Sequence, residues 1–151
     1  MIPRALLVIL RVHLGVILLV TDLGKLTRDT PFSVEMLAFL QHAVRNASAP
    51  YRHFVEALVI PHAGTFSVLV MLGELFAGVS LLLGAATRVG ATVAMFLFLN
   101  YMLAKGRMFW SPDSEDAAVF FSALVVGLGA AGRSWGVDAW LHRRWPRAPV
   151  W

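Results

Sequence analysis

Long apolar runs dominate the pattern of hydrophobic and polar positions in this chain, and four of them approach the length of a membrane crossing. A helix of about 20 mostly apolar residues spans the hydrocarbon of a bilayer. The pattern predicts four transmembrane helices, over residues 5–26, 66–86, 89–104 and 117–132. The last two are short and suit a thin bilayer. The turn at residues 86–88 is so tight that we expect antiparallel neighbours on either side of it.

The connection between the first two runs, residues 27–65, has an amphipathic pattern instead. Thr30-Pro31 is a helix-start signal, and apolar residues then recur at helical spacing at Met36, Leu37, Leu40 and Val44. A helix of this kind lies in the membrane interface. The predicted fold is therefore all-α: an integral membrane four-helix bundle, with an interfacial amphipathic segment between its first and second helices. Residues 1–151 form one domain, since no linker divides them.

Composition supports the bilayer as the solvent of this protein. Apolar residues make up 58% of the chain, charged residues 15%, and the mean hydropathy is +0.71. Soluble domains carry about 25% charged residues. The first run follows Arg4 as a signal peptide would, but Arg11 interrupts it and no small-x-small cleavage site precedes Asp22, so we expect a retained helix. The absence of cysteine excludes disulfides, thiolate metal sites and iron–sulfur ligation by this chain.

Ionisable residues inside membrane spans are costly and therefore informative. Helical geometry places Arg11, Asp22 and Lys25 along one stripe of the first helix. Glu74 lies near the middle of the second span, with Arg11 as a candidate partner, and Asn100 of the third helix could join them. We expect these five residues to form an intramembrane polar cluster. The cluster either locks the helix register or handles a substrate, a quinone or protons.

Aromatic and basic residues collect where we expect the membrane surface. Residues 134–151 form a tail without a membrane span, and Trp110 lies in the polar loop before the fourth run. These residues predict contacts with anionic lipid or with a partner: Trp110, Trp135, Trp140, Arg143, Arg144, Trp145 and Trp151. No soluble face with interleaved basic and aromatic residues exists, so nucleic acid is not an expected partner.

No catalytic or metal-binding motif accompanies the spans. The five histidines include no pair at the i, i+4 spacing of a helical metal site, so no metal is predicted. A nucleophile motif, a phosphate-binding loop and a dinucleotide fingerprint are also missing. Without a self-sufficient catalytic set, we expect that the chain alone is not an enzyme, and we expect no intrinsic cofactor.

Three segments give the chain a resemblance to a known family. They are LRVHLGVILLVTDLGKL at 10–26, GELFAGVSLLLGAATRVGA at 73–91 and FFSALVVGLGAAGRSWGVDAWL at 120–141. The chain resembles the DoxX-like family of small bacterial and archaeal membrane proteins. That family includes the large membrane subunit of an archaeal thiosulfate:quinone oxidoreductase. The resemblance implies a four-helix membrane bundle and an association with quinone-linked redox systems.

Together these observations favour an accessory subunit of a larger respiratory or photosynthetic membrane complex. Its expected partners are membrane lipids, other membrane subunits and a second copy of the chain, and its expected ligand is a quinone or a lipid. The alternative is a quinone-linked oxidoreductase subunit, in which Arg11, Glu74 and Asn100 line a quinone-sized cavity. A small transporter ranks last, because four short helices leave little room for a polar path. We expect a multi-pass protein of the bacterial inner membrane, and the basic tail favours cytoplasmic termini.

Overall fold

The computed structural model describes residues 3–147, which form helices and turns without a β-strand. Seven α-helices, two 3-10 turns (η1 and η3) and one π-helical segment (η2) follow one another in this part of the chain. In order they are α1 (Arg4–Leu26), α2 (Phe32–Ala43), η1 (Val44–Asn46), α3 (Ala49–Phe54), η2 (Val55–Val59), α4 (Ala63–Leu83), α5 (Thr87–Lys105), α6 (Glu115–Leu128), η3 (Ala131–Arg133) and α7 (Val137–Arg144).

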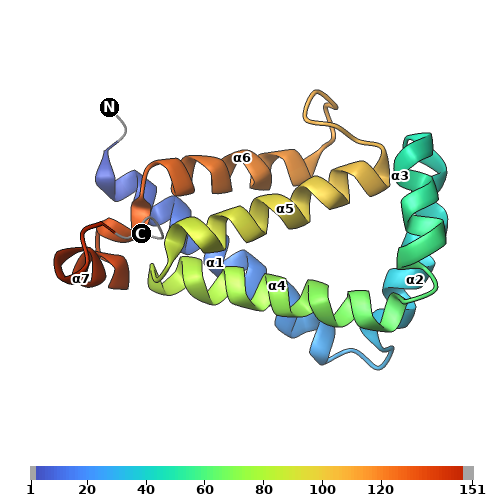
Figure 1. The fold of residues 1–151 in the computed structure, drawn as a ribbon, viewed down its shortest axis with the longest axis horizontal. Coiled ribbons are helices and arrows are strands. Elements are labelled where there is room, and N and C mark those ends of the chain that lie inside the picture. The colour runs from blue at the N-terminus through green and yellow to red at the C-terminus, as the bar shows by residue number, and fades with distance from the viewer. Residues whose placement is uncertain (1–2, 148–151) are drawn as a thin grey trace.

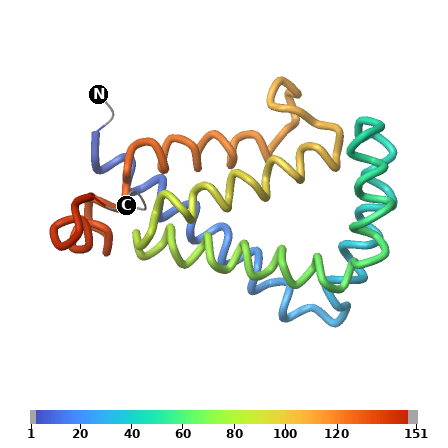
Figure 2. Tube along the Cα trace, viewed as in Figure 1, coloured from blue at the N-terminus to red at the C-terminus, as the bar shows by residue number. Residues whose placement is uncertain are grey.

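Four long helices pack side by side with alternating direction (Figures 1 and 2). Helix α5 lies between α4 and α6, while α1 contacts both α4 and α6. Their shared core includes Leu14, Leu18, Leu81 and Val126, together with alanines that allow close packing. Helix α7 lies at one end of this group, and α2 and α3 lie across the other end (Figure 1).

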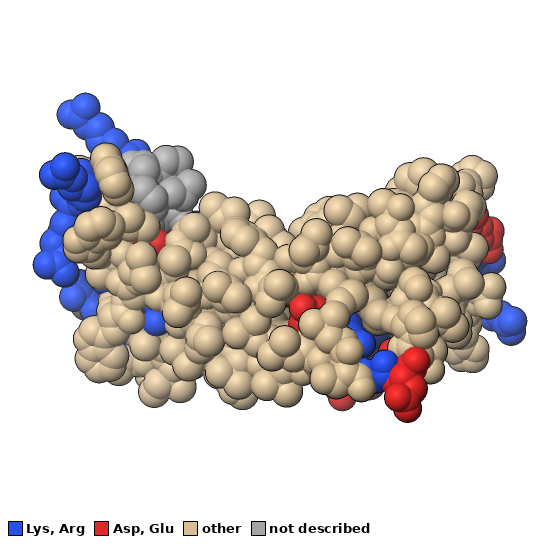
Figure 3. Space-filling model, turned by 90° about the horizontal axis from the view of Figure 1, so that it is seen from below, with Lys and Arg blue, Asp and Glu red and all other residues tan. Residues whose placement is uncertain are grey.

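Three of these helices, α1, α4 and α5, are long and apolar enough to cross a membrane. Only 33% of the most apolar stretch of α1 and of α4 is buried inside the protein, so most of its side chains face outward. Figure 3 shows a broad middle part of the surface largely without charge, with Lys and Arg side chains gathered at the end that holds α7. An outward apolar surface of this extent needs lipid around it.

The expectation of four helices was incomplete. Helices α2, α3 and α7 form within the predicted connection and the predicted tail. Helix α6 has 14 residues, which is short of the roughly 20 that span a bilayer. It stops at Leu128 because the chain turns at Gly129 and Ala130, and Ala130 adopts a left-handed φ of 46°.

The second predicted span is displaced toward the N-terminus. Residues 66–86 were expected, but α4 covers Ala63–Leu83 and ends at Gly84. Gly84 has a φ of 65°, a left-handed conformation that glycine adopts without a steric penalty and that commonly ends helices. Helix α5 begins only three residues later, at Thr87, and packs against α4 as an antiparallel neighbour, which confirms the predicted tight turn.

The predicted amphipathic helix is present as α2. It buries Met36, Leu40 and Ala43, the apolar side of the pattern. These side chains join Val55 of η2 and Ala104 of α5 in a second apolar cluster. The long connection therefore folds back against α4 and α5 and covers one end of the helix group (Figure 1).

Helices α1 and α4 approach each other closely at two glycines. A Cβ atom at Gly15 would lie 2.6 Å from the backbone nitrogen of Leu82, and one at Gly78 would lie 2.8 Å from Cγ of Leu19. Both distances are too short for a real side chain. Small residues permit this approach, and it fixes how the two helices are aligned along their lengths.

Candidate functional site

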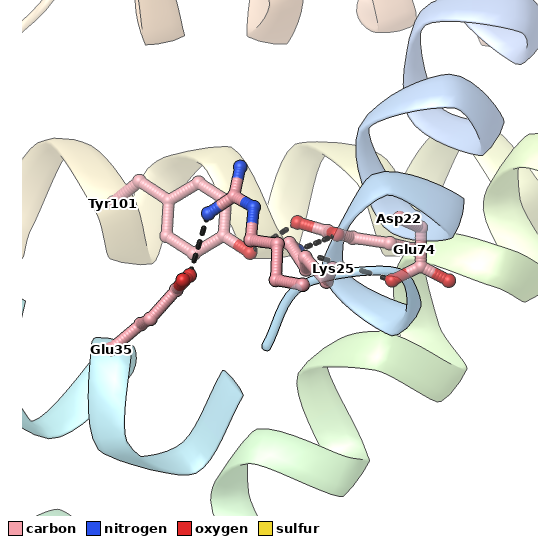
Figure 4. Close-up of polar contacts among 6 residues, drawn as sticks. Asp22, Lys25, Glu35, Glu74 and Tyr101 are labelled. Atoms are coloured by element: carbon pink, nitrogen blue, oxygen red, sulfur yellow. Dashed lines mark hydrogen bonds and ion pairs between the residues drawn. The ribbon is translucent and has the colours of Figure 1, made fainter. Parts of the chain in front are cut away.

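Four polar side chains from three helices meet inside the helix group (Figure 4). Lys25 comes from the end of α1, Glu74 from the middle of α4 and Tyr101 from the last part of α5. Lys25 Nζ donates a hydrogen bond to Glu74 Oε2, and the Tyr101 hydroxyl donates one to Glu74 Oε1 at 2.6 Å. Asp22 Oδ1 lies 3.9 Å from Lys25 Nζ. We call Asp22, Lys25, Glu74 and Tyr101 the Lys25 cluster.

The charges of the Lys25 cluster are withdrawn from solvent. Asp22 is 2% exposed and Glu74 is 3% exposed. The Lys25 side chain is 9% exposed, and the ring of Phe32 covers it at 4.4 Å from Nζ to the ring centroid. A buried charge is tolerated when it is paired and hydrogen-bonded. The cluster meets this requirement for Lys25 and Glu74.

Asp22 is less well compensated. The cluster holds two carboxyl groups and one ammonium group, and Asp22 Oδ1 has no hydrogen-bond partner among the described residues. Two carboxylates close to one cation leave one formal negative charge, which a proton or a bound cation would neutralise. The cluster can therefore bridge three helices, and it can also hold an exchangeable proton.

The alignment of α1 with α4 explains why Asp22 and Lys25, and not Arg11, lie beside Glu74. Gly15 packs against Leu82 and Gly78 packs against Leu18 and Leu19, so the antiparallel helices bring Asp22 and Lys25 level with Glu74. The predicted stripe on α1 does face inward, since Arg11, Asp22 and Leu18 are all buried. Asp22 and Lys25 nevertheless lie well along α1 from Arg11, as the helical rise of 1.5 Å per residue requires.

Arg11 therefore does not pair with Glu74, contrary to the sequence-based hypothesis. Its Nη2 donates to the carbonyl oxygen of Trp135 at 3.2 Å, at the end of the molecule that carries α7. Arg11 is 2% exposed, and its Nε and Nη1 lack a hydrogen-bond partner among the described residues. Gly84 and Gly136 make room for the guanidinium, because a Cβ on either would lie within 2.3 Å of Arg11 Nη1.

Asp138 organises the same end of the molecule. Its carboxylate accepts hydrogen bonds from the backbone N–H groups of Ala86 at 2.7 Å and Thr87 at 2.8 Å. Its own backbone N–H donates to the carbonyl oxygen of Gly84 at 2.8 Å. Asp138 thereby caps the N-terminus of α5 and holds α7 against the turn between α4 and α5.

Asn100 lies outside both the Lys25 cluster and the contacts around Arg11 and Asp138. Its Oδ1 accepts a hydrogen bond from the Tyr51 hydroxyl at 3.0 Å, and its Nδ2 donates to the carbonyl oxygen of Phe96 at 2.7 Å. Burial raises the pKa of Tyr51, which keeps its hydroxyl protonated and able to donate. Asn100 therefore attaches α3 to α5.

The predicted surface residues are exposed. Trp135 is 82% exposed, Trp110 70%, Trp140 62% and Trp145 52%. Arg143 and Arg144 are exposed on α7. Trp151 lies outside the described residues. The tryptophans lie at both ends of the long helices, with Trp110 in the loop between α5 and α6 and the others around α7.

Tyr101 is the member of the Lys25 cluster that sequence reasoning missed. An aromatic residue near the end of a span is usually an interfacial anchor, and nothing local distinguishes Tyr101 from that role. A signal was present in its spacing, because Tyr101 lies on the side of α5 that also carries Leu97, Ala94 and Ala104, all of them buried.

The described residues contain no group of three or more His, Asp or Glu side chains that could hold a metal ion. Two cavities, of about 820 Å³ and about 350 Å³, open elsewhere, and no member of the Lys25 cluster lines either of them. The low exposure of Asp22 and Glu74 shows that the cluster is packed among the side chains of its helices.

Comparison with known proteins yields one family match. The family model named DoxX matches residues 6–107, which include all of α2 to α5, α1 except its first two residues, and every member of the Lys25 cluster. No curated protein and no solved structure matches the chain. The match covers well over half of the 151 residues, and this membrane protein belongs to the DoxX family.

Proposed function

We propose that this protein crosses the membrane four times and serves as an accessory subunit of a larger redox or energy-conversion complex. Helix α6 would provide the fourth crossing, extended by η3 and packed against α5 and α1. A crossing this short is compatible with local thinning of the bilayer. The four long helices and their alternating directions support this topology.

One observation carries the accessory role: Lys25 and Glu74, buried inside the helix group, pair with each other. The Glu74 carboxylate accepts hydrogen bonds from both Lys25 and Tyr101, and it thereby joins α1, α4 and α5. Such a contact defines the alignment of helices, as interhelical polar contacts in membranes do. The exposed aromatic side chains at both ends then offer surfaces to neighbouring subunits and lipids.

Purification of the tagged protein from its native membranes in mild detergent tests this function. We expect stoichiometric co-purification of another membrane subunit, identified by mass spectrometry, and an absorbance spectrum of a pigmented or haem-bearing complex. Trp110→Ala and Trp135→Ala alter opposite ends of the molecule and should show which end holds the partner. Recovery of the chain alone, from membranes in which the complex is expressed, would contradict the accessory role.

The excess carboxyl group of the Lys25 cluster favours a second candidate, a quinone-linked oxidoreductase subunit. Quinone reduction consumes protons, and Asp22 and Glu74 together could supply one. Organic extraction of the purified protein would then yield bound quinone, and Glu74→Gln would lower the yield while leaving the helical circular dichroism unchanged. If Glu74→Gln retains both its fold and its quinone content, the Lys25 cluster has no quinone role.

We further propose that the protein lies in the inner membrane of a bacterium with its termini in the cytoplasm. The end that carries α7 includes the basic run Arg143, Arg144 and Arg147. Basic residues next to spans are retained on the cytoplasmic side. The opposite end carries as many basic residues, but they are spread through the long connection and the loop before α6.

A further inference from the structure

The larger cavity lies at the end of the molecule that holds α7. It has a volume of about 820 Å³, within the range of about 300–1,000 Å³ that small-molecule sites occupy. Its wall includes three arginines from three different elements: Arg4 of α1, Arg133 of η3 and Arg143 of α7. None of the described residues that line it is acidic.

Acidic residues are nearly absent from this whole end. Of the nine Asp and Glu residues in the sequence, only Asp138 lies here, and its 0% exposed carboxylate accepts from Ala86 and Thr87. Arg144 and Arg147 add further positive charge nearby. Figure 3 shows this concentration of Lys and Arg at one end. The cavity therefore lies in a strongly positive region, which attracts anions.

Apart from Ser134, the remaining lining is apolar or aromatic. Ala5, Val8 and Leu83 contribute apolar surface, and Trp135 and Trp140 contribute indole rings. On the same turns of α1, Leu6 and Ile9 are 55% and 63% exposed, so the cavity adjoins the outward apolar surface of that helix. Tryptophan prefers the headgroup level of a bilayer. An occupant should thus combine an anionic group with an apolar chain.

We propose that this cavity binds the headgroup of an anionic phospholipid, with the phosphate between Arg4, Arg133 and Arg143 and an acyl chain along α1. The charge of the arginines matches the phosphate, and the exposed apolar surface of α1 matches the acyl chain. A soluble phosphate would use the arginines and leave the apolar surface unoccupied. The site requires only that the chain lie in a membrane, and it does not depend on any partner subunit.

Quenching of tryptophan fluorescence tests the site, because Trp135 and Trp140 line it. The full-length protein, delipidated in a neutral detergent, is titrated with phosphatidylglycerol or phosphatidylcholine that carries brominated acyl chains. We expect phosphatidylglycerol to bind at least tenfold more tightly. Inorganic phosphate at millimolar concentration should not displace it. Equal binding of the two lipids, or displacement by inorganic phosphate, would overturn the proposal.

Two neighbouring arginines on α7 provide a matched comparison. Arg143→Gln should weaken phosphatidylglycerol binding roughly fivefold, the effect of about one basic residue at an anionic lipid surface. Arg144→Gln removes the same charge one residue later, outside the cavity lining, and should change binding less than twofold. Arg133→Gln removes a lining arginine of η3 and should weaken phosphatidylglycerol binding by about the same factor as Arg143→Gln. Equal weakening by Arg143→Gln and Arg144→Gln would show a diffuse charge effect and exclude a defined site, provided that circular dichroism shows intact helices.

Discussion

The carboxylate of Asp138 accepts a hydrogen bond from the backbone N–H of Thr87 at 2.8 Å, across 51 residues of sequence. This contact holds α7 against the turn between α4 and α5. Helix α7 lies outside residues 6–107, the part that matches the family model, yet it caps a helix inside that part. The buried Asp138 side chain thus ties the C-terminal segment to helices α4 and α5.

Asp138→Asn should destabilise the protein by about 2 kcal/mol. The variant retains the shape of the side chain but loses the charge that caps α5 and presents an NH₂ group to a backbone donor. Thermal unfolding in mild detergent, followed by circular dichroism, measures the effect. Asp113→Asn is the control, because Asp113 is 64% exposed and pairs with Arg107 at the surface. A stability loss no larger than that of the control would contradict the capping role.

Lys25→Met should lower the free energy of unfolding by about 3–5 kcal/mol, since it leaves the buried Glu74 without its counter-charge. Adding Glu74→Gln to the same chain should restore part of this loss. Arg28→Met breaks a surface pair with Glu35 and should cost less than about 1 kcal/mol. Unfolding titrations of the wild type, Lys25→Met, Glu74→Gln and the double variant give the coupling between Lys25 and Glu74. Strictly additive effects would show that the two groups are independent.

Gly15→Ala should destabilise the contact between α1 and α4 by about 1–3 kcal/mol, because its methyl group would lie 2.6 Å from a backbone atom of Leu82. Gly24 on the same helix has nothing within 4 Å of an added Cβ. Gly24→Ala should therefore leave stability unchanged or raise it slightly. Thermal unfolding of the two variants compares the same chemical change at two sites, and equal melting temperatures would be incompatible with the close approach.

The absence of native cysteine allows a direct test of orientation. Arg144→Cys and Asp113→Cys each introduce the only thiol of the chain, on α7 and in the loop before α6. In intact cells, a membrane-impermeant maleimide should label the Asp113→Cys protein and should label the Arg144→Cys protein only after lysis. The reverse pattern would place the termini outside the cytoplasm. Labelling of both thiols in intact cells would contradict crossings by all four long helices.

The apolar pattern predicted where α1 and α5 lie to within two residues, because their runs have clear polar boundaries. It placed the second span three residues too late at each end, since Ala63 and Gly64 were assigned to the connection and the left-handed Gly84 was not recognised as the stop. Helix α7 was not predicted, because its eight residues have no strong apolar pattern.

The partners of the buried charges were harder to predict than the charges themselves. The helical stripe on α1 was evident from spacing, but its alignment with α4 depends on how Gly15 and Gly78 pack against that helix. Arg11 and Lys25 lie about 21 Å apart along α1, at a rise of about 1.5 Å per residue. An alignment that placed Arg11 beside Glu74 would therefore differ from the observed one by about four helical turns. Hydropathy locates each span in the sequence, but it does not show which residues of two spans lie side by side.

The hydrogen bond from Arg11 to Trp135 also has a consequence for biosynthesis. Synthesis proceeds from the N-terminus, so α1 is made 124 residues before the carbonyl group that accepts from its buried guanidinium. A nascent first helix therefore carries an unsatisfied cation in or near the hydrocarbon, a costly state. Assembly is complete only when the segment around Trp135 reaches α1, and a chain released before that point would display an exposed charge that quality-control proteases could recognise.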